Sequence, residues 1–271
     1  NKEIRNYSSI INSHFENNDN MLSGYNGYAF VGLWDVGTIM IKGNSFKNLK
    51  TDQNTMDKGR GIIAFSATLS LSDYCPSTGT SYVSLSQSQA TSITPCTDAV
   101  RNHFEGLYYG ISATNVTGLP NSIVHIDRAE FENVYHSIYI DNGNYSSITR
   151  CDFNIASTDP AATNNSNLYD AYGIYMDGSD GYRVEENDLS KYAAQQGIRG
   201  IIVNNSMDNN NEIYKNILTT TGYAIQTQQD NRGSKSGLGI YCNTMSGSYN
   251  DIVVLDQGIA EHQKIITLDA N

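Results

Sequence analysis

The chain has 271 residues, of which 17 are basic and 28 acidic, so its formal net charge at pH 7 is −11. This charge argues against nonspecific nucleic-acid binding and against binding to anionic membranes, because both need basic surface patches. The 23 glycines and only 4 prolines exclude a collagen-like chain and an ordinary disordered linker, and no apolar run is long enough to span a membrane.

Short runs of β-forming residues follow one another along the chain, separated by Asn, Gly, Ser and Asp, and no sustained apolar stripe with helical spacing accompanies them. Apolar residues recur within these runs in pairs five positions apart. Taken in chain order, the pairs are Ile10/Phe15, Ile41/Phe46, Ile126/Phe131, Ile148/Phe153, Val184/Leu189, Ile213/Leu218 and Ile240/Met245, with Ala99/Phe104 as a weaker match. Such a recurrence predicts a repeat architecture.

A second apolar anchor, usually Ile after a small residue, follows each pair. The clearest anchors, in chain order, are Ile111, Ile138, Ile174, Ile201 and Ile225. In the shortest repeats seven positions lead from the pair to the anchor and ten lead on to the next pair, so the minimal unit has about 22 residues. Longer repeats carry insertions in these two segments, and the largest lies between Ile62 and Ala99.

Three short strands in each unit predict an all-β fold, a right-handed parallel β-helix of about eight coils in which like residues stack about 4.8 Å apart. Residues 1–271 would form a single domain, with Phe131 and Phe153 in its interior. Asn recurs two positions before the second residue of a pair. There we expect it to adopt the left-handed backbone region and to form an amide ladder between coils.

The repeat pattern resembles the parallel β-helix repeats of the pectin-lyase-like superfamily. The segments 41–46 and 240–245 also look like repeats in secreted surface proteins of Bacteroidota, many of which are exported by the type IX system. The resemblance covers residues from about 10 to 255. It implies a fold rather than a function, because this fold carries lyases, hydrolases, phage tailspikes and adhesive stalks.

The four cysteines fall into two groups. Cys75 and Cys96 bracket a Ser/Thr/Gln-rich stretch in an insertion at about 66–98, which predicts a disulfide that contributes roughly 3 kcal/mol. The bond would imply an oxidising, extracytoplasmic setting, and two unpaired thiols are the alternative. Cys151 and Cys242 lie three coils apart, about 14 Å, so we predict that they do not pair.

In pectin-lyase-like enzymes the substrate groove lies along the strand that carries the second anchor, and the resemblance implies the same face here. Residues one and three positions after an anchor point outward, which places Tyr139 beside Tyr175 and Asp141 beside Asp177, followed by Asn204. Adjacent carboxylates repel, so we expect a raised pKa or a shared calcium ion. Their spacing would suit a retaining glycosidase, and a solvated face without a ligand is the alternative.

The catalytic signatures of the family are absent: the groove strands carry no outward Arg or Lys, and the polygalacturonase motifs do not occur. We therefore expect a non-enzymatic module of a secreted or cell-surface protein, a structural or adhesive scaffold that could bind glycans through this face. The alternative is a polysaccharide-active enzyme, a glycoside hydrolase or lyase, with Asp141 and Asp177 as its acids. We expect no cofactor other than calcium at Asp141 and Asp177. The chain begins without Met and is expected to be a piece of a longer polypeptide with flanking domains.

Overall fold

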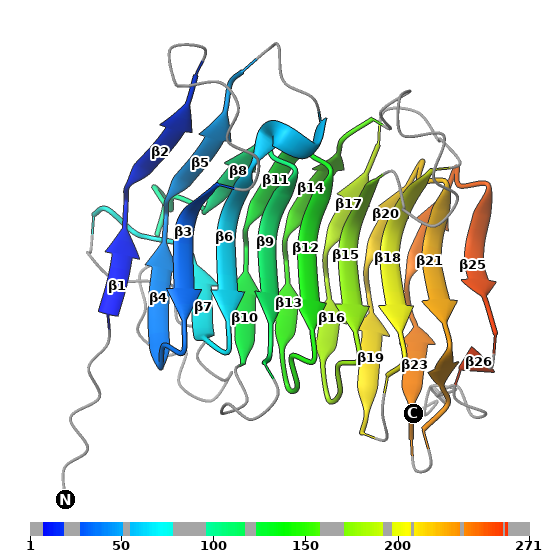
Figure 1. The fold of residues 1–271 in the computed structure, drawn as a ribbon. Helices are drawn as coiled ribbons and strands as arrows, with labels where there is room; N and C mark the ends of the chain where they lie inside the picture. Colours follow the sequence, from blue (N-terminus) through cyan, green and yellow to red (C-terminus); the bar gives the residue numbers. More distant parts are fainter. Residues whose placement is uncertain are drawn as a thin grey trace, which may run out of the picture.

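The computed structural model describes residues 8–18, 28–50, 55–77, 96–116, 123–157, 171–191, 197–206, 209–233, 236–256 and 258–259. Within these ranges the chain is almost entirely β-structure, and one 3-10 turn, η1 (Thr55–Lys58), is its sole helical segment. The strands form three eight-stranded sheets, which we call sheets A, B and C, and a small two-stranded sheet (Figure 1). No helix in the described ranges is both long enough and apolar enough to cross a membrane.

Leaving aside β22, which belongs to the small sheet, each of the three large sheets takes every third strand of the chain, with parallel neighbours. Sheet A contains β1 (Ser8–Ile11), β4 (Thr38–Lys42), β7 (Thr68–Ser72), β10 (Val124–Asp127), β13 (Ser147–Thr149), β16 (Arg183–Glu185), β19 (Asn211–Tyr214) and β23 (Leu238–Tyr241). Sheet B contains β2 (His14–Asn17), β5 (Ser45–Asn48), β8 (His103–Glu105), β11 (Glu130–Val134), β14 (Asp152–Ile155), β17 (Asp188–Ser190), β20 (Ile217–Thr219) and β24 (Thr244–Ser246).

Sheet C contains β3 (Ala29–Trp34), β6 (Arg60–Phe65), β9 (Tyr109–Thr114), β12 (His136–Asp141), β15 (Ala171–Asp177), β18 (Ile198–Asn204), β21 (Tyr223–Gln228) and β25 (Asn250–Val254). The small sheet pairs β22 (Asp230–Asn231) with β26 (Gly258–Ile259). We call three consecutive strands, one from each large sheet, a rung. The chain visits the sheets in the order A, B, C in every rung, an arrangement compatible with a solenoid.

The residues singled out by the repeat spacing occupy equivalent positions in successive rungs. Ile10 lies opposite Ile41 in sheet A, Phe131 opposite Phe153 in sheet B, and Ile138 opposite Ile174 in sheet C. These residues point inward because alternate residues of a strand face opposite sides of its sheet. The prediction of an all-β chain built from parallel repeats is confirmed.

A stack of phenylalanine rings fills the part of the interior next to sheet B. Successive rings of Phe46, Phe104, Phe131 and Phe153 lie 4.7, 4.9 and 4.8 Å apart between centroids and are nearly parallel. Phe131 and Phe153 are each 2% exposed, as the spacing predicts. The stacking distance is that of neighbouring parallel strands, so the backbone hydrogen bonds and the ring contacts favour the same register.

At the corner between sheets A and B the structure corrects one expectation. In the rungs of Asn44, Asn187 and Asn216 the left-handed residue is not the Asn but the residue before it, and φ is 60° at Gly43, 56° at Glu186 and 53° at Lys215. The Asn side chain instead bonds to the neighbouring rungs. Asn216, for example, donates Nδ2 to the carbonyl oxygen of Val184 (2.9 Å) and its backbone N–H to Oδ1 of Asn243 (2.9 Å).

The predicted insertion at 66–98 begins later than expected. Strand β7 occupies its first part and pairs with β4 and β10, because Leu69 and Leu71 alternate inward like the other core residues of sheet A. Residues 78–95 lie outside the described ranges. Cys75 and Cys96, the predicted pair, are joined by a disulfide with a Cα–Cα distance of 5.9 Å, while Cys151 and Cys242 are free.

Candidate functional site

The outer face of sheet C brings together the five residues that the spacing selects. Tyr139 on β12 pairs in register with Tyr175 on β15, and Asp141, Asp177 and Asn204 occupy one position on β12, β15 and β18. The residues between them, Ile140, Met176 and Val203, point inward and are buried. We call these five residues the Tyr/Asp cluster.

Side-chain hydrogen bonds within this cluster converge on Asp177. Tyr139 Oη donates to Asp177 Oδ2 at 3.1 Å, and Asn204 Nδ2 donates to Asp177 Oδ1 at 2.8 Å. Asp141 accepts a hydrogen bond from Asn142 Nδ2 at 2.6 Å. The tyrosine rings meet edge to face, with centroids 5.4 Å apart and planes at 87°. Tyrosine and amide donors therefore hold Asp177 in place from both neighbouring strands.

The cluster is half-buried, whereas the spacing argument predicts that its residues are exposed together. The difference arises because the Tyr139 ring packs against Tyr175 and its hydroxyl bonds to Asp177, while the Tyr175 ring also packs against Tyr172. Burial and the nearby negative charge of Asp177 raise the pKa of Asp141. Burial, together with the carboxylates of Asp177 and Asp141, also raises the pKa of the Tyr139 hydroxyl, which therefore remains a hydrogen-bond donor at neutral pH.

A cation at the carboxylate pair would have to share Asp177 with its present partners. Each oxygen of Asp177 accepts one hydrogen bond, from Tyr139 or from Asn204, and keeps a second lone pair. Among the described residues, the sole group of three or more His, Cys, Asp and Glu side chains close enough to share an ion is Cys75, Cys96 and Asp98. Its two sulfur atoms are joined in the disulfide and are not available as thiolate ligands.

A row of aromatic side chains lies beside the Tyr/Asp cluster, two residues before the anchors of β9, β12 and β15. The His136 ring stacks on Tyr172, with centroids 4.4 Å apart, and its other side lies 4.8 Å from the Tyr109 ring. Arg60 lies over the outer side of Tyr109, with the guanidinium carbon 5.1 Å from the ring centroid. His136 and Tyr172 are buried, so this row supports the strands of sheet C and does not offer a ligand surface.

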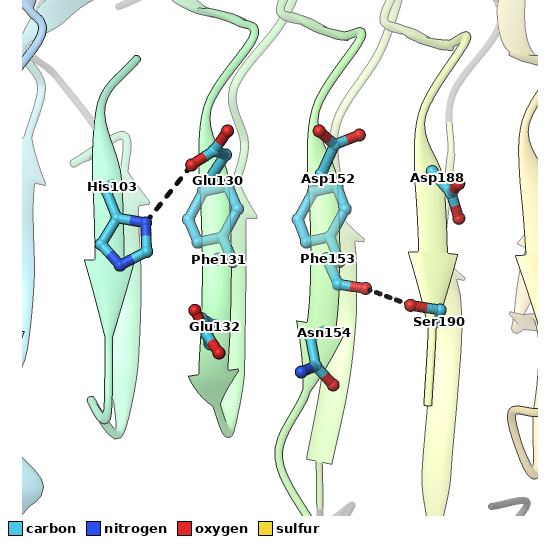
Figure 2. Close-up of a pocket in the computed structure, with 9 residues that line it drawn as sticks. All are labelled: His103, Glu130, Phe131, Glu132, Asp152, Phe153, Asn154, Asp188 and Ser190. Carbon is cyan, nitrogen blue, oxygen red and sulfur yellow. Dashed lines mark hydrogen bonds and ion pairs between the residues drawn. The ribbon is translucent and has the colours of Figure 1, made fainter. Parts of the chain in front are cut away.

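Spacing did not single out a second polar feature, a groove of about 390 Å³ on the outer face of sheet B (Figure 2). Its lining comes from strands β8, β11, β14 and β17. The residues are His103, Glu130, Phe131, Glu132, Asp152, Phe153, Asn154, Asp188 and Ser190. In three successive rungs an acidic residue directly precedes the inward apolar residue of sheet B, and this recurrence is visible in the sequence. The pairs are Glu130 before Phe131, Asp152 before Phe153 and Asp188 before Leu189.

Part of the negative charge in this groove is neutralised within the protein. Arg101 forms ion pairs with Glu130 and Asp152, and His103 Nδ1 lies 3.4 Å from Glu130 Oε2. Burial and the neighbouring Asp152 raise the pKa of Asp188. The two phenylalanine rings that line the groove belong to the interior stack and are buried, so the groove offers carboxylates but no exposed aromatic face.

A third groove, of about 530 Å³, lies on the outer face of sheet A and carries both charges. Arg150 makes a two-point ion pair with Asp127, with both nitrogen–oxygen distances 2.8 Å. Arg183 pairs with Glu185 at 2.9 Å. The lining charges are therefore largely paired with each other.

Comparison of the chain with protein-family models, with curated proteins and with solved structures finds no match. Function must therefore be inferred from the geometry of these three faces. The outer face of sheet C combines aromatic rings at the surface with two carboxylates and an amide that hydrogen bonds hold in fixed positions.

Proposed function

We propose that the chain is a module of a secreted or cell-surface protein that binds glycans through the Tyr/Asp cluster and acts as a rigid structural or adhesive scaffold. In this proposal the three sheets close into a right-handed parallel β-helix of about eight coils, of the pectin-lyase-like kind found in Bacteroidota surface proteins exported by the type IX system. Three parallel sheets visited in a fixed order support the fold. The Cys75–Cys96 disulfide supports an oxidising compartment.

The observation that carries the proposal is the joint placement of two tyrosines, two carboxylates and an amide on three adjacent strands. Aromatic side chains suit the apolar faces of sugar rings, and carboxylate and amide groups suit sugar hydroxyls. The hydrogen bonds to Asp177 fix the cluster before a ligand arrives, which lowers the entropic cost of binding. A net charge of −11 disfavours polyanionic glycans, so the proposed ligands are neutral.

A glycan array followed by calorimetric titration of the glycans that bind tests this proposal. The Tyr139→Ala/Tyr175→Ala double variant should lose about tenfold or more in affinity, since removal of an aromatic contact costs about 0.5–1.5 kcal/mol. The control is Tyr214→Ala/Tyr241→Ala, which removes a comparable pair from sheet A, with ring centroids 5.0 Å apart. Equal loss in both variants, or in neither, would contradict the assignment. Titrations with calcium and with a chelator show whether the carboxylate pair also binds the ion.

A second candidate function, glycoside hydrolysis or lyase activity, is favoured by the inequality of the two carboxyl groups. Burial and Asp177 raise the pKa of Asp141, while Asp177 accepts hydrogen bonds from Tyr139 and Asn204. Carboxyl groups in unlike environments on adjacent strands are what acid–base catalysis on a glycosidic bond requires. Asp141→Asn and Asp177→Asn should each abolish release of reducing ends from a polysaccharide panel. Activity that survives both substitutions would exclude this pair.

A further inference from the structure

Trp34 is the single tryptophan of the chain, and it lies largely in solvent. It ends strand β3 and is 64% exposed, more than any other large apolar side chain in the described ranges. Its ring lies 4.9 Å from that of Phe65 between centroids, with the planes at 46°. Gly32, two residues earlier on the same face of β3, adds no side chain to this surface. Such exposure is informative because tryptophan side chains are highly buried on average in soluble proteins.

The two rings occupy the same outward column of sheet C as the carboxylates of the Tyr/Asp cluster. Trp34 pairs in register with Phe65, Phe65 with Thr114, and Thr114 with Asp141. The column then continues through Asp177 to Asn204. Three strand spacings of about 4.8 Å separate Trp34 from Asp141, or about 14 Å. An exposed indole, a half-buried phenyl ring, a hydroxyl and the carboxylates therefore lie on one line across the strands.

We propose that Trp34 and Phe65 form an aromatic subsite for the far end of a neutral oligosaccharide whose other end lies at Asp141 and Asp177. This inference rests on the proposed function and specifies its ligand: a linear glycan long enough to reach across about 14 Å, so that short sugars occupy only part of the site.

The surroundings of the two rings favour a sugar over a protein partner. Ile63 is the one other apolar side chain on the outer faces of β3 and β6 near them, and on β9 the hydroxyl groups of Ser112 and Thr114 border them. A stable protein interface buries at least about 1,200 Å², far more than two rings and one isoleucine supply. A pyranose ring needs one aromatic face and nearby hydrogen-bonding groups, and this column provides both.

The solitary tryptophan allows a direct test in the full chain. Neutral β-1,4-linked hexasaccharides of glucose, xylose and mannose, and the matching disaccharides, are titrated while tryptophan emission and its quenching by acrylamide are recorded. The hexasaccharide that binds should shift the emission to shorter wavelength and protect Trp34 from the quencher. Trp34→Ala should bind it about tenfold more weakly, and Trp34→Phe should recover part of the affinity. Tyr249→Ala removes a similarly exposed ring, 59% accessible, outside the column and should bind like wild type.

The outcomes separate this inference from the glycan-binding proposal. If a hexasaccharide binds and Tyr139→Ala/Tyr175→Ala abolishes binding, but Trp34 emission and the affinity of Trp34→Ala do not change, the Trp34 subsite is overturned and the cluster stands. If Trp34→Ala loses binding and the tyrosine variant does not, the subsite stands and the role of the tyrosines is overturned. Equal affinity for disaccharide and hexasaccharide contradicts the extended ligand, and absence of binding by every probe overturns both proposals.

Discussion

Cys151 occupies a position in the amide ladder where Asn stands in most rungs, and we expect Cys151→Asn to stabilise the protein. In the next rungs the ladder Asn donates Nδ2 to the carbonyl oxygen of a sheet A core residue, Ile148 for Asn187 (3.0 Å) and Val184 for Asn216 (2.9 Å). The equivalent carbonyl for residue 151 belongs to Ile126, and the sulfur atom is 4.0 Å from it. The cysteine therefore leaves the ladder only weakly joined at this rung.

The magnitude follows from the bonds that an asparagine would make. Its Nδ2 could donate to Ile126 O and to Asn187 Oδ1, as Asn187 does to its own neighbours. Its Oδ1 would accept from the backbone N–H of Ala129, which already bonds to the sulfur. Each bond contributes about 0.5–1.5 kcal/mol net to stability, and the desolvation cost of burying the amide offsets part of this gain. We expect a gain of about 1–2 kcal/mol, or roughly 2–4 °C in Tm for each kcal/mol.

Urea unfolding monitored by circular dichroism measures the difference, with Cys151→Ala and Cys151→Ser as controls. Alanine keeps the corner backbone but offers no side-chain bond, and serine offers one short hydroxyl. The expected order of stability is Asn above Cys, with Ala lowest, because an unsatisfied backbone group in a buried site costs about 1–3 kcal/mol. An asparagine variant less stable than the alanine variant would refute the ladder argument, since it would mean that the corner cannot accommodate the amide that its neighbours use.

Three further predictions concern the interior, the disulfide and the carboxylate pair. Phe131→Ala should lower the free energy of unfolding in urea by about 3–5 kcal/mol, because the ring is buried between two stacked neighbours whose centroids lie 4.9 and 4.8 Å away. A loss below about 1 kcal/mol would place the ring outside the core. Replacing both Cys75 and Cys96 with Ser should lower the free energy of unfolding by about 3 kcal/mol, because the disulfide joins residues 21 positions apart. An unchanged free energy would mean that the disulfide does not restrict the unfolded chain. Burial and Asp177 raise the pKa of Asp141, so its contribution to stability is present when the carboxyl is protonated and is lost as the pH rises through that raised value. Asp141→Asn should therefore be more stable than wild type at pH 7, and the difference in unfolding free energy should vanish below pH 3.8, the ordinary pKa of an Asp carboxyl. Asp177→Asn should be less stable than wild type at pH 7 because it weakens two hydrogen bonds. Equal effects of the two substitutions would contradict the inequality of the pair.

The interior of this protein can be predicted from the repeat spacing because the apolar residues of each rung pack against the equivalent residues of the rungs on either side. Ile138, Ile174 and Ile201 are recognisable in the sequence as anchors and lie in register in the structure. The same reasoning misses β7, since Leu69 and Leu71 have no partner five positions later and the following insertion hides their rung.

The backbone conformation at the corner between sheets A and B and the side-chain arrangement of the Tyr/Asp cluster cannot be predicted from the repeat spacing. Residues before the ladder Asn, such as Glu186 and Lys215, carry the left-handed backbone, although neither is a residue type that favours this conformation. Which residues belong to the Tyr/Asp cluster can be predicted, because alternate side chains of a strand point to opposite faces of its sheet. Its half-burial and the hydrogen bonds to Asp177 depend on side-chain rotamers, which the repeat does not fix.

The three outer faces differ most in how their carboxylates are partnered. On sheet A, Asp127 is paired with Arg150, and on sheet B, Glu130 and Asp152 are paired with Arg101. On sheet C, by contrast, no ion pair of the described residues includes Asp141 or Asp177, whose partners are tyrosine and amide groups. Two adjacent carboxylates without a cation repel each other, so this arrangement costs stability, as it also does on sheet B, where burial and Asp152 raise the pKa of the neighbouring Asp188. On sheet C alone among the three described faces, however, such carboxylates lie in one column with the exposed Trp34, and this combination of charge and aromatic surface is the physical reason to propose a ligand there.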